Sequence, residues 1–384
     1  MKAILVLQDG ATYIGESIGA AGTTFGETVF STAMTGYQEM LTDPSYAGQL
    51  LTLTYPLIGN YGVTPADFES DRVQVNGFII RELCESPSNW RSGETLQEFL
   101  STHNVVGIQG IDTRALTRRL RVGGVMMGAI STEYSRDELL QKLDEAPNYS
   151  QIDFVRRVTA PKTYVWEGDM GSKEAEKGKG AGELYAENLA TRDERPRKRI
   201  ALVDCGVKRN IMRNLAALNC DITVFPCTAS SDEILDTNPQ GVVISPGPGD
   251  PALLGYMIDT VKDIAGKKPL LGICLGNQLL GWAYGGRTFK LKFGHRGGNH
   301  PVKDLRTGRV YITSQNHGYA VDADSLDPKS GMEVAHINMN DGTVEGMRHR
   351  ELPIFSIQYH PEASPGPRDS GYLFNEFFER VVGC

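Results

Sequence analysis

The 384-residue chain lacks several patterns that would place it in a class at once. No tract of five basic residues occurs, and the net charge of −8 argues against nonspecific nucleic-acid binding. The six cysteines are scattered, without Cys-x-x-Cys spacing. The apolar run of residues 3–7 ends at a polar turn and is too short for a signal peptide or a membrane span. We therefore expect a reduced, cytoplasmic protein without a membrane segment.

Three regions that differ in composition and in secondary-structure pattern follow one another along the chain. Residues 1–155 open with a hairpin around Asp9-Gly10 and contain further strand patterns, and Asp112 caps an expected helix from Thr113 to about Arg121. This pattern predicts a mixed α/β, β-rich N-terminal domain. Residues 156–198 are charged and predict a linker. Residues 199–384 form the expected C-terminal domain.

The C-terminal region alternates between strand and helix patterns. Strands are expected at residues 200–204, 222–226, 241–245 and 270–273, with helices at 209–218 and 275–284. Such alternation predicts a doubly wound, largely parallel sheet with its chemistry at the carboxyl ends of the strands. The loop 247–251 (Gly-Pro-Gly-Asp-Pro) follows the third of these strands, and Cys274 follows the fourth.

Cys274 has glycine on both sides, at positions 272 and 276, on a turn from strand to helix. This spacing is that of the nucleophile elbow G-x-S-x-G, with sulfur in place of the hydroxyl. The helix N-terminus lowers a thiol pKa and offers N–H groups to an oxyanion. A thiolate also needs a proton shuttle and an orienting acid. His360 and Glu362 are two residues apart on an extended segment and can lie side by side.

The alternative to this interpretation is a buried structural cysteine beside a surface histidine. The elbow, its two glycines and the His-x-Glu step together favour a catalytic triad of Cys274, His360 and Glu362. His295, His300 and His317 invite a metal interpretation, but their segments are rich in glycine and asparagine and show no carboxylate or cysteine at ligand spacing. We expect structural roles for them in loops, and no metal site. Cys205, Cys220 and Cys227 are expected in the core.

The segments 272–278, 245–251 and 360–362 together resemble a class I (triad) glutamine amidotransferase domain. The segments 35–46, 293–301 and 360–367 resemble the small-subunit family of glutamine-hydrolysing carbamoyl-phosphate synthetase, and this resemblance covers nearly the whole chain. It implies hydrolysis of glutamine to glutamate and ammonia through a γ-glutamyl thioester on Cys274. It also implies a separate large subunit that uses ammonia, bicarbonate and ATP with Mg²⁺ to make carbamoyl phosphate for arginine and pyrimidine biosynthesis. No cofactor is expected in this chain.

The resemblance also implies a glutamine site. The residues carried over are Ser45, Gly247, Gly249, Leu275, Gln278, Asn316, Gly318 and Tyr319. The N–H groups of Gly247 and Leu275 would form the oxyanion hole, and Lys208 matches a lysine of the family's domain junction. Hydroxyl, amide and backbone groups suit a neutral amide substrate. Asn277 and Tyr319 stand where histidine and phenylalanine are commoner, and we expect these differences to affect packing.

Three rival functions compete with this interpretation. The triad motifs alone also suit an amidotransferase serving anthranilate, GMP or CTP synthesis, but those enzymes have no counterpart of residues 35–46. A non-catalytic regulatory subunit would be expected to have lost its nucleophile or base, and this chain keeps all three triad residues. A cysteine peptidase on the same sheet is disfavoured by the loop 247–251.

Overall fold

The structure, a computed structural model, describes residues 1–168 and 197–383. The described chain divides into two compact units, Met1–Ile152 and the described residues from Asp153 onward. This division falls three residues before the boundary expected at residue 155. Most of the linker expected at 156–198 lies outside the described residues. Its first part belongs to the second unit, because β10 (Tyr164–Val165) pairs with a strand there.

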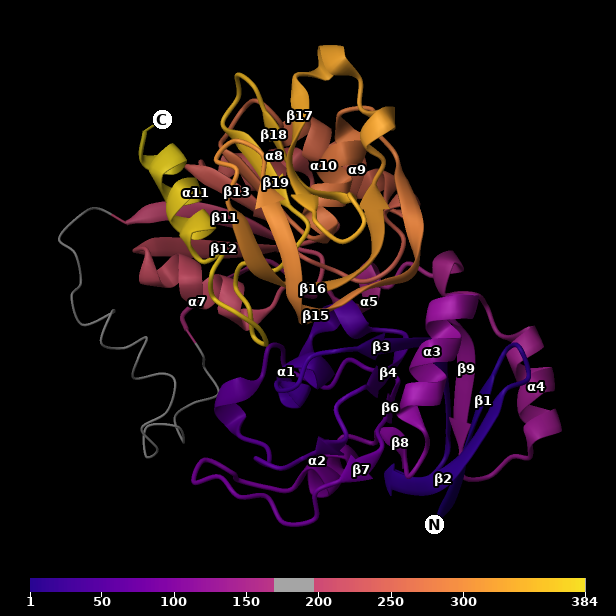
Figure 1. The fold of residues 1–384 in the computed structure, drawn as a ribbon. Helices are drawn as coiled ribbons and strands as arrows, with labels where there is room; N and C mark the ends of the chain where they lie inside the picture. The colour runs from indigo at the N-terminus through magenta and orange to yellow at the C-terminus, as the bar shows by residue number, and fades with distance from the viewer. Residues whose placement is uncertain (169–196, 384) are drawn as a thin grey trace. The chain divides into compact units, whose positions relative to one another are not determined.

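Seven strands of the first unit close into a barrel in the order β1-β2-β8-β6-β4-β3-β9 (Figure 1). β1 pairs antiparallel with both β2 and β9, which closes the ring. The predicted hairpin is confirmed at β1–β2, where Gly10 takes the positive φ of 84° that its turn requires. The strands are β1 (Lys2–Leu7), β2 (Thr12–Gly19), β3 (Thr23–Ser31), β4 (Gln49–Leu53), β6 (Gly77–Ile79), β8 (Val106–Gln109) and β9 (Met126–Ser131).

Short helices surround this barrel. They are α1 (Tyr37–Thr42), α2 (Leu96–Thr102), α3 (Thr113–Gly123) and α4 (Arg136–Glu145), with 3-10 turns at Pro44–Tyr46, Pro65–Asp67 and Tyr149–Gln151. The expected cap of α3 is confirmed, because the Asp112 side chain accepts from the N–H of Ala115. A two-stranded sheet, β5 (Leu57–Ile58) with β7 (Glu82–Leu83), completes the unit.

The second unit is built on one ten-stranded sheet in the order β10-β12-β11-β13-β14-β19-β18-β17-β15-β16. The five strands from β12 to β19 are parallel, as expected. They are β12 (Cys220–Pro226), β11 (Lys198–Asp204), β13 (Gly241–Ile244), β14 (Leu270–Ile273) and β19 (Ile354–Ile357). The other half of the sheet, which the sequence did not indicate, is antiparallel. It consists of β18 (Val344–His349), β17 (Met332–Asn338), β15 (Thr288–Asp304) and β16 (Val310–Val321).

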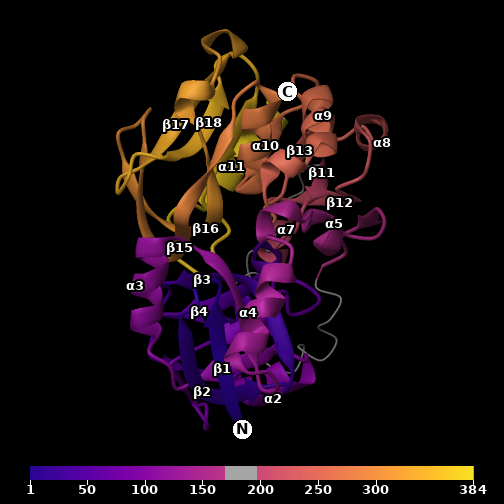
Figure 2. The same ribbon diagram turned by 90° about the vertical axis from the view of Figure 1, so that its right-hand side faces the viewer.

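Helices cover both faces of the parallel half (Figures 1 and 2). Alternate residues of β11 belong to different cores: Ala201 and Val203 pack in one cluster, Ile200 and Leu202 in the other. The first cluster includes residues of α9 (Gly255–Ile264) and α10 (Leu275–Ala283), the second residues of α7 (Arg209–Ala217) and α11 (Tyr372–Val382). The other helices that the structure describes in this unit are α5 (Val155–Val158), α8 (Ser231–Asp236) and 3-10 turns at Pro251–Leu253, Ala323–Ser325 and Pro328–Ser330.

Two further expectations concern the whole chain. Within the described ranges, no helix combines the length and the apolar character needed to cross a lipid bilayer. Cys205, Cys220 and Cys227 are buried, as expected of core cysteines.

Candidate active site

The predicted elbow is present between β14 and α10. Cys274 has φ 52° and ψ −101°, a backbone conformation that L-residues rarely adopt. A Cβ on Gly272 would lie 2.6 Å from the backbone of Gly276, and a Cβ on Gly276 would lie 2.4 Å from the carbonyl oxygen of Ile244. Both contacts are shorter than any side chain tolerates, so this turn requires glycine on each side of the cysteine.

Sheet pairing brings the nucleophile to its base. Ile273 at the end of β14 pairs with Ile357 at the end of β19, and the N–H of Cys274 donates to the Ile357 carbonyl at 2.8 Å. His360 follows β19 and is buried beside Cys274. Its Nδ1 lies 2.6 Å from Oε1 of Glu362. The structure therefore brings together the three residues that the sequence predicted as a triad.

Lys208 forms an ion pair with Glu362, the acid of this triad. Its Nζ lies 3.0 Å from Glu362 Oε1, and both side chains are almost fully buried. Nζ also donates to the carbonyl of Ala363 at 2.6 Å, and Nδ2 of Asn210 donates to the Glu362 carbonyl. The family resemblance implies a place for Lys208 at a domain junction, and this stays a prediction. Its ion pair with Glu362 was not foreseen, because 154 residues separate the two in the chain.

The charges of this cluster set its protonation. Burial alone would lower the pKa of His360, but the adjacent Glu362 and Cys274 raise it to about 10. Burial alone would raise the pKa of Glu362, but Lys208 and His360 lower it to about 2. At neutral pH the site therefore holds an imidazolium between the carboxylate of Glu362 and the sulfur of Cys274.

The two residues expected to form the oxyanion hole are close to each other. Gly247 follows β13, and a Cβ there would lie 2.8 Å from Leu275 Cδ2 and 2.2 Å from the carbonyl oxygen of Cys205. Only glycine permits this approach to the residue that follows the nucleophile. Gly249, two residues further on, has φ 95°. That the N–H groups of Gly247 and Leu275 bind an oxyanion stays a prediction.

Among the expected glutamine-binding residues of β16, Asn316 contacts the nucleophile and Tyr319 contacts Gln278. Cys274 Sγ is 3.8 Å from the carbonyl oxygen of Asn316, and Gln278 Nε2 donates to the carbonyl of Tyr319 at 2.9 Å. Gly318 lies between these two residues on the same strand. Ser45 belongs to the first unit, in the turn Pro44–Tyr46, where its N–H donates to Asp43. Its Oγ is buried and has no hydrogen-bond partner among the described residues, so its contact with substrate stays a prediction.

One residue at the nucleophile was missed by the sequence analysis. Gln358 is fully buried, and its Nε2 lies 3.6 Å from Cys274 Sγ. It stands two residues before His360, so the same rule that paired His360 with Glu362 also places Gln358 on the side of the site.

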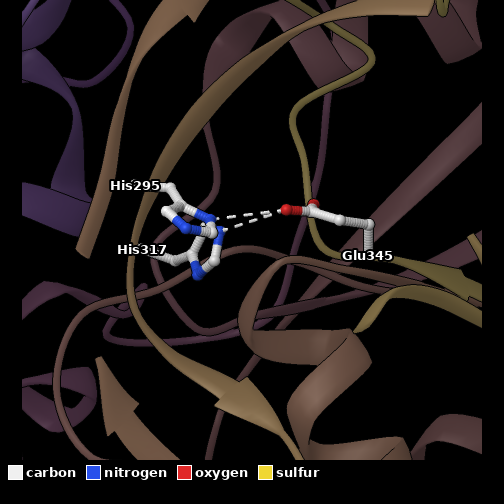
Figure 3. A group of neighbouring side chains, drawn as sticks. All are labelled: His295, His317 and Glu345. Atoms are coloured by element: carbon white, nitrogen blue, oxygen red, sulfur yellow. Dashed lines mark ion pairs between the residues drawn. The ribbon is translucent and has the colours of Figure 1, made fainter. Parts of the chain in front are cut away.

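The three histidines that suggested a metal are not in loops, which corrects that expectation. His295 and His300 lie on β15, and His317 lies on β16. Carboxylates that are distant in the sequence nevertheless lie beside two of them. His295 Nε2 lies 2.8 Å from Asp341 Oδ2, and Glu345 points toward the rings of His295 and His317 (Figure 3).

One group in the described part of the chain has ligand atoms near enough to share a metal ion. It consists of His295, His317 and Glu345, whose ligand atoms lie within 4.8 Å of one another. Its atoms already have partners inside the protein. Asn338 donates to Glu345 Oε1 at 2.8 Å, and His317 Nε2 lies 2.9 Å from Gln315 Oε1. Burial lowers the pKa of His317 well below its usual value. We assign no metal here, and the expected absence of one stays a prediction.

Comparison with known proteins agrees with the geometry of this site. The family described as glutamine amidotransferase class-I matches residues 201–380, the part of the chain that contains the triad. The fold and site therefore define the second unit as a class I amidotransferase domain. The family described as carbamoyl-phosphate synthase small chain, CPSase domain, matches residues 5–130.

Curated relatives extend this match over the full chain. Proteins named carbamoyl phosphate synthase small chain from Nostoc sp., Aquifex aeolicus and Syntrophotalea carbinolica are 50%, 49% and 49% identical to it. The alignments cover 99%, 99% and 98% of this chain and 95%, 99% and 97% of the relatives. The chain belongs to the carbamoyl phosphate synthase small chain family.

Proposed function

We propose that this chain is the glutaminase subunit of a glutamine-hydrolysing carbamoyl phosphate synthase. The observation that carries the proposal is the buried triad: Cys274 on its elbow, beside a histidine whose Nδ1 lies 2.6 Å from Glu362. Family membership adds the substrate and the partner. The large subunit would receive the ammonia and would carry the ATP and Mg²⁺ chemistry.

In the first half of the reaction the Cys274 thiolate attacks the carboxamide carbon of glutamine. The oxyanion that forms is stabilised by N–H donors at the elbow, for which Gly247 and Leu275 are the candidates. His360, protonated in the free site, gives its proton to the amide nitrogen. The C–N bond breaks, ammonia leaves, and a γ-glutamyl thioester remains on the sulfur.

In the second half of the reaction, water hydrolyses the thioester. His360, now neutral, takes a proton from the water that attacks the thioester carbon. The C–S bond breaks, glutamate leaves, and the thiolate and the imidazolium are restored. Throughout, the ion pair with Lys208 keeps Glu362 ionised. Glu362 accepts a hydrogen bond from the Nδ1–H of His360, so that Nε2 is the atom that exchanges protons.

The test is the Cys274→Ser variant, assayed in complex with the large subunit. Glutamine-dependent carbamoyl phosphate synthesis should be lost, and ammonia-dependent synthesis should persist because it does not use this site. A diazoketone analogue of glutamine should label Cys274 and none of the other five cysteines. Glutamine hydrolysis that survives in Cys274→Ser, or labelling at Cys205, would contradict the proposal.

A further inference from the structure

The side chain of Gln358 lies in a fully buried position between the nucleophile and a group of polar residues. It follows β19, and its backbone N–H donates to the carbonyl of Glu345 at 2.8 Å. Its side-chain amide meets Cys274 on one side, with Nε2 3.6 Å from Sγ. On the other side its Oε1 meets the amides of Asn277 and Gln278, at 3.1 and 3.2 Å.

The orientation of this amide follows from its neighbours. The carbonyl of Tyr319 can only accept, so the Gln278 atom that contacts it at 2.9 Å must be the nitrogen. The same nitrogen lies against Gln358, and the Gln358 atom facing it must therefore be the oxygen. The remaining end of the Gln358 amide, which faces Cys274, is then the N–H donor.

Asn277 reinforces this orientation from the same turn of α10. Its Oδ1 accepts from the hydroxyl of Ser356 at 2.8 Å, which leaves Nδ2 to donate to Gln358. From the sequence, we expect the difference at Asn277 to affect packing. The structure instead connects Asn277 to the nucleophile through a single intervening amide.

A donor at this place matters because of what else surrounds the sulfur. The carbonyl oxygen of Asn316, 3.8 Å from Sγ, offers a thiolate no hydrogen bond. Besides His360, the Gln358 amide is therefore the side-chain donor that the described contacts aim at Cys274. A buried anion without donors is costly, and hydrogen bonds to charged groups are among the strong ones in proteins.

We propose that Gln358 is a further catalytic residue, whose Nε2–H group stabilises the Cys274 thiolate both as attacking nucleophile and as leaving group. The proposal rests on the proposed thiol chemistry and adds a residue to it. When the sulfur becomes acylated its negative charge disappears and the hydrogen bond weakens. When the thioester is hydrolysed the charge returns to the same atom, and the donor again stabilises it.

Two substitutions separate this role from packing. Gln358→Met keeps the length of the side chain and removes its donor. Gln358→Glu keeps an oxygen for Asn277 and Gln278 and places a second oxygen against the sulfur. The matched control is Gln315→Met, which removes another buried amide of this unit that makes no described contact with Cys274.

The measurement is the rate of alkylation of Cys274 by iodoacetamide against pH, followed by mass spectrometry on the full chain. Gln358→Met should raise the midpoint of this profile by at least about one pH unit and slow alkylation at low pH by roughly 10- to 100-fold, the worth of one hydrogen bond to a charged group. Gln358→Glu should shift the midpoint further. Gln315→Met should leave it unchanged, even if its melting temperature falls.

A midpoint that does not move in a folded Gln358 variant overturns the proposal, because a purely structural residue would change stability alone. If neither Gln358 variant folds, Asn277→Asp is measured instead. It removes the Nδ2 donor that orients the Gln358 amide and should raise the midpoint by a smaller amount. An unchanged midpoint again refutes the role. Failure of the proposed function is distinguishable, since it would appear as glutamine hydrolysis persisting in Cys274→Ser.

Discussion

Replacing Lys208 by methionine should lower the stability of the second unit at neutral pH and flatten the decline of its stability in acid. Lys208 Nζ lies 3.0 Å from Glu362 Oε1, with the two side chains 2% and 0% exposed. The pKa of Glu362 is about 2, compared with an ordinary value of 4.5. At 1.36 kcal/mol per pKa unit, this depression corresponds to about 3 kcal/mol of folding stability.

The direction of the pH effect follows from the sign of the shift. The pKa of Glu362 is lower in the folded state, so its contribution is fully present above about pH 4.5 and is lost as the pH falls toward 2. In Lys208→Met the burial that raises this pKa remains, whereas the strongest charge that lowers it is gone. The loss of stability on acidification should therefore be smaller in the variant, because the pKa values of Glu362 in the folded and unfolded states then lie closer together. At neutral pH the variant should lose about 3–5 kcal/mol, the usual cost of breaking a buried ion pair.

Calorimetric melting temperatures between pH 3 and pH 8 would measure both effects in the full chain. The control is Arg197→Met, because its ion pair with Asp221 is about half exposed and is worth about 0–1 kcal/mol. Lys208→Met with the same acid profile as the wild type would refute the reasoning, since Glu362 would then owe its low pKa to other groups. So would a loss at neutral pH no larger than that of Arg197→Met.

The remaining predictions concern the elbow, the triad and the histidine cluster. Gly276→Ala should abolish glutaminase activity and lower the melting temperature, because its Cβ would lie 2.4 Å from a backbone oxygen, whereas Gly255→Ala, in open space at the start of α9, should be tolerated. His360→Asn should slow thioester formation by roughly two to four orders of magnitude in rapid-quench assays, and Glu362→Gln should slow it less, since Glu362 does not itself exchange a proton with the substrate; equal losses would mean that the roles are wrong. Dialysis against EDTA should leave glutamine hydrolysis unchanged, and a stoichiometric metal found by mass spectrometry would contradict this.

Sequence reasoning found the parts of the site that are local. The elbow depends on two glycines within five residues, and His360 and Glu362 depend on one extended step. Each pattern defines its own local geometry, and in the structure Cys274 and His360 lie beside each other. Lys208 and Gln358 contact the triad from outside these motifs. No spacing rule connects position 208 with position 362, and Gln358 has an amide that is equally common in unremarkable strands.

The fold shows the same division between local and distant information. The parallel half of the second sheet was predictable because each strand is a short apolar run followed by a helix. The antiparallel half was missed because β15 contains Gly294, Gly297 and Gly298, which resemble a loop in the sequence. The barrel of the first unit was also missed. Its closure depends on pairs such as β2 with β8 and β4 with β6, which lie far apart in the chain.

The register of two neighbouring strands connects the fold to the chemistry. β14 and β19 end together at the pair Ile273 and Ile357, and the catalytic residues follow directly from these ends. Side chains alternate along an extended segment, so a slip of one residue in this pairing would turn His360 away from Cys274 and bring the side chain of Tyr359 into its place. The buried packing of Tyr359 in the core opposes such a slip. The hydrophobic pattern of β19 thus selects the side of the chain on which the proton shuttle stands.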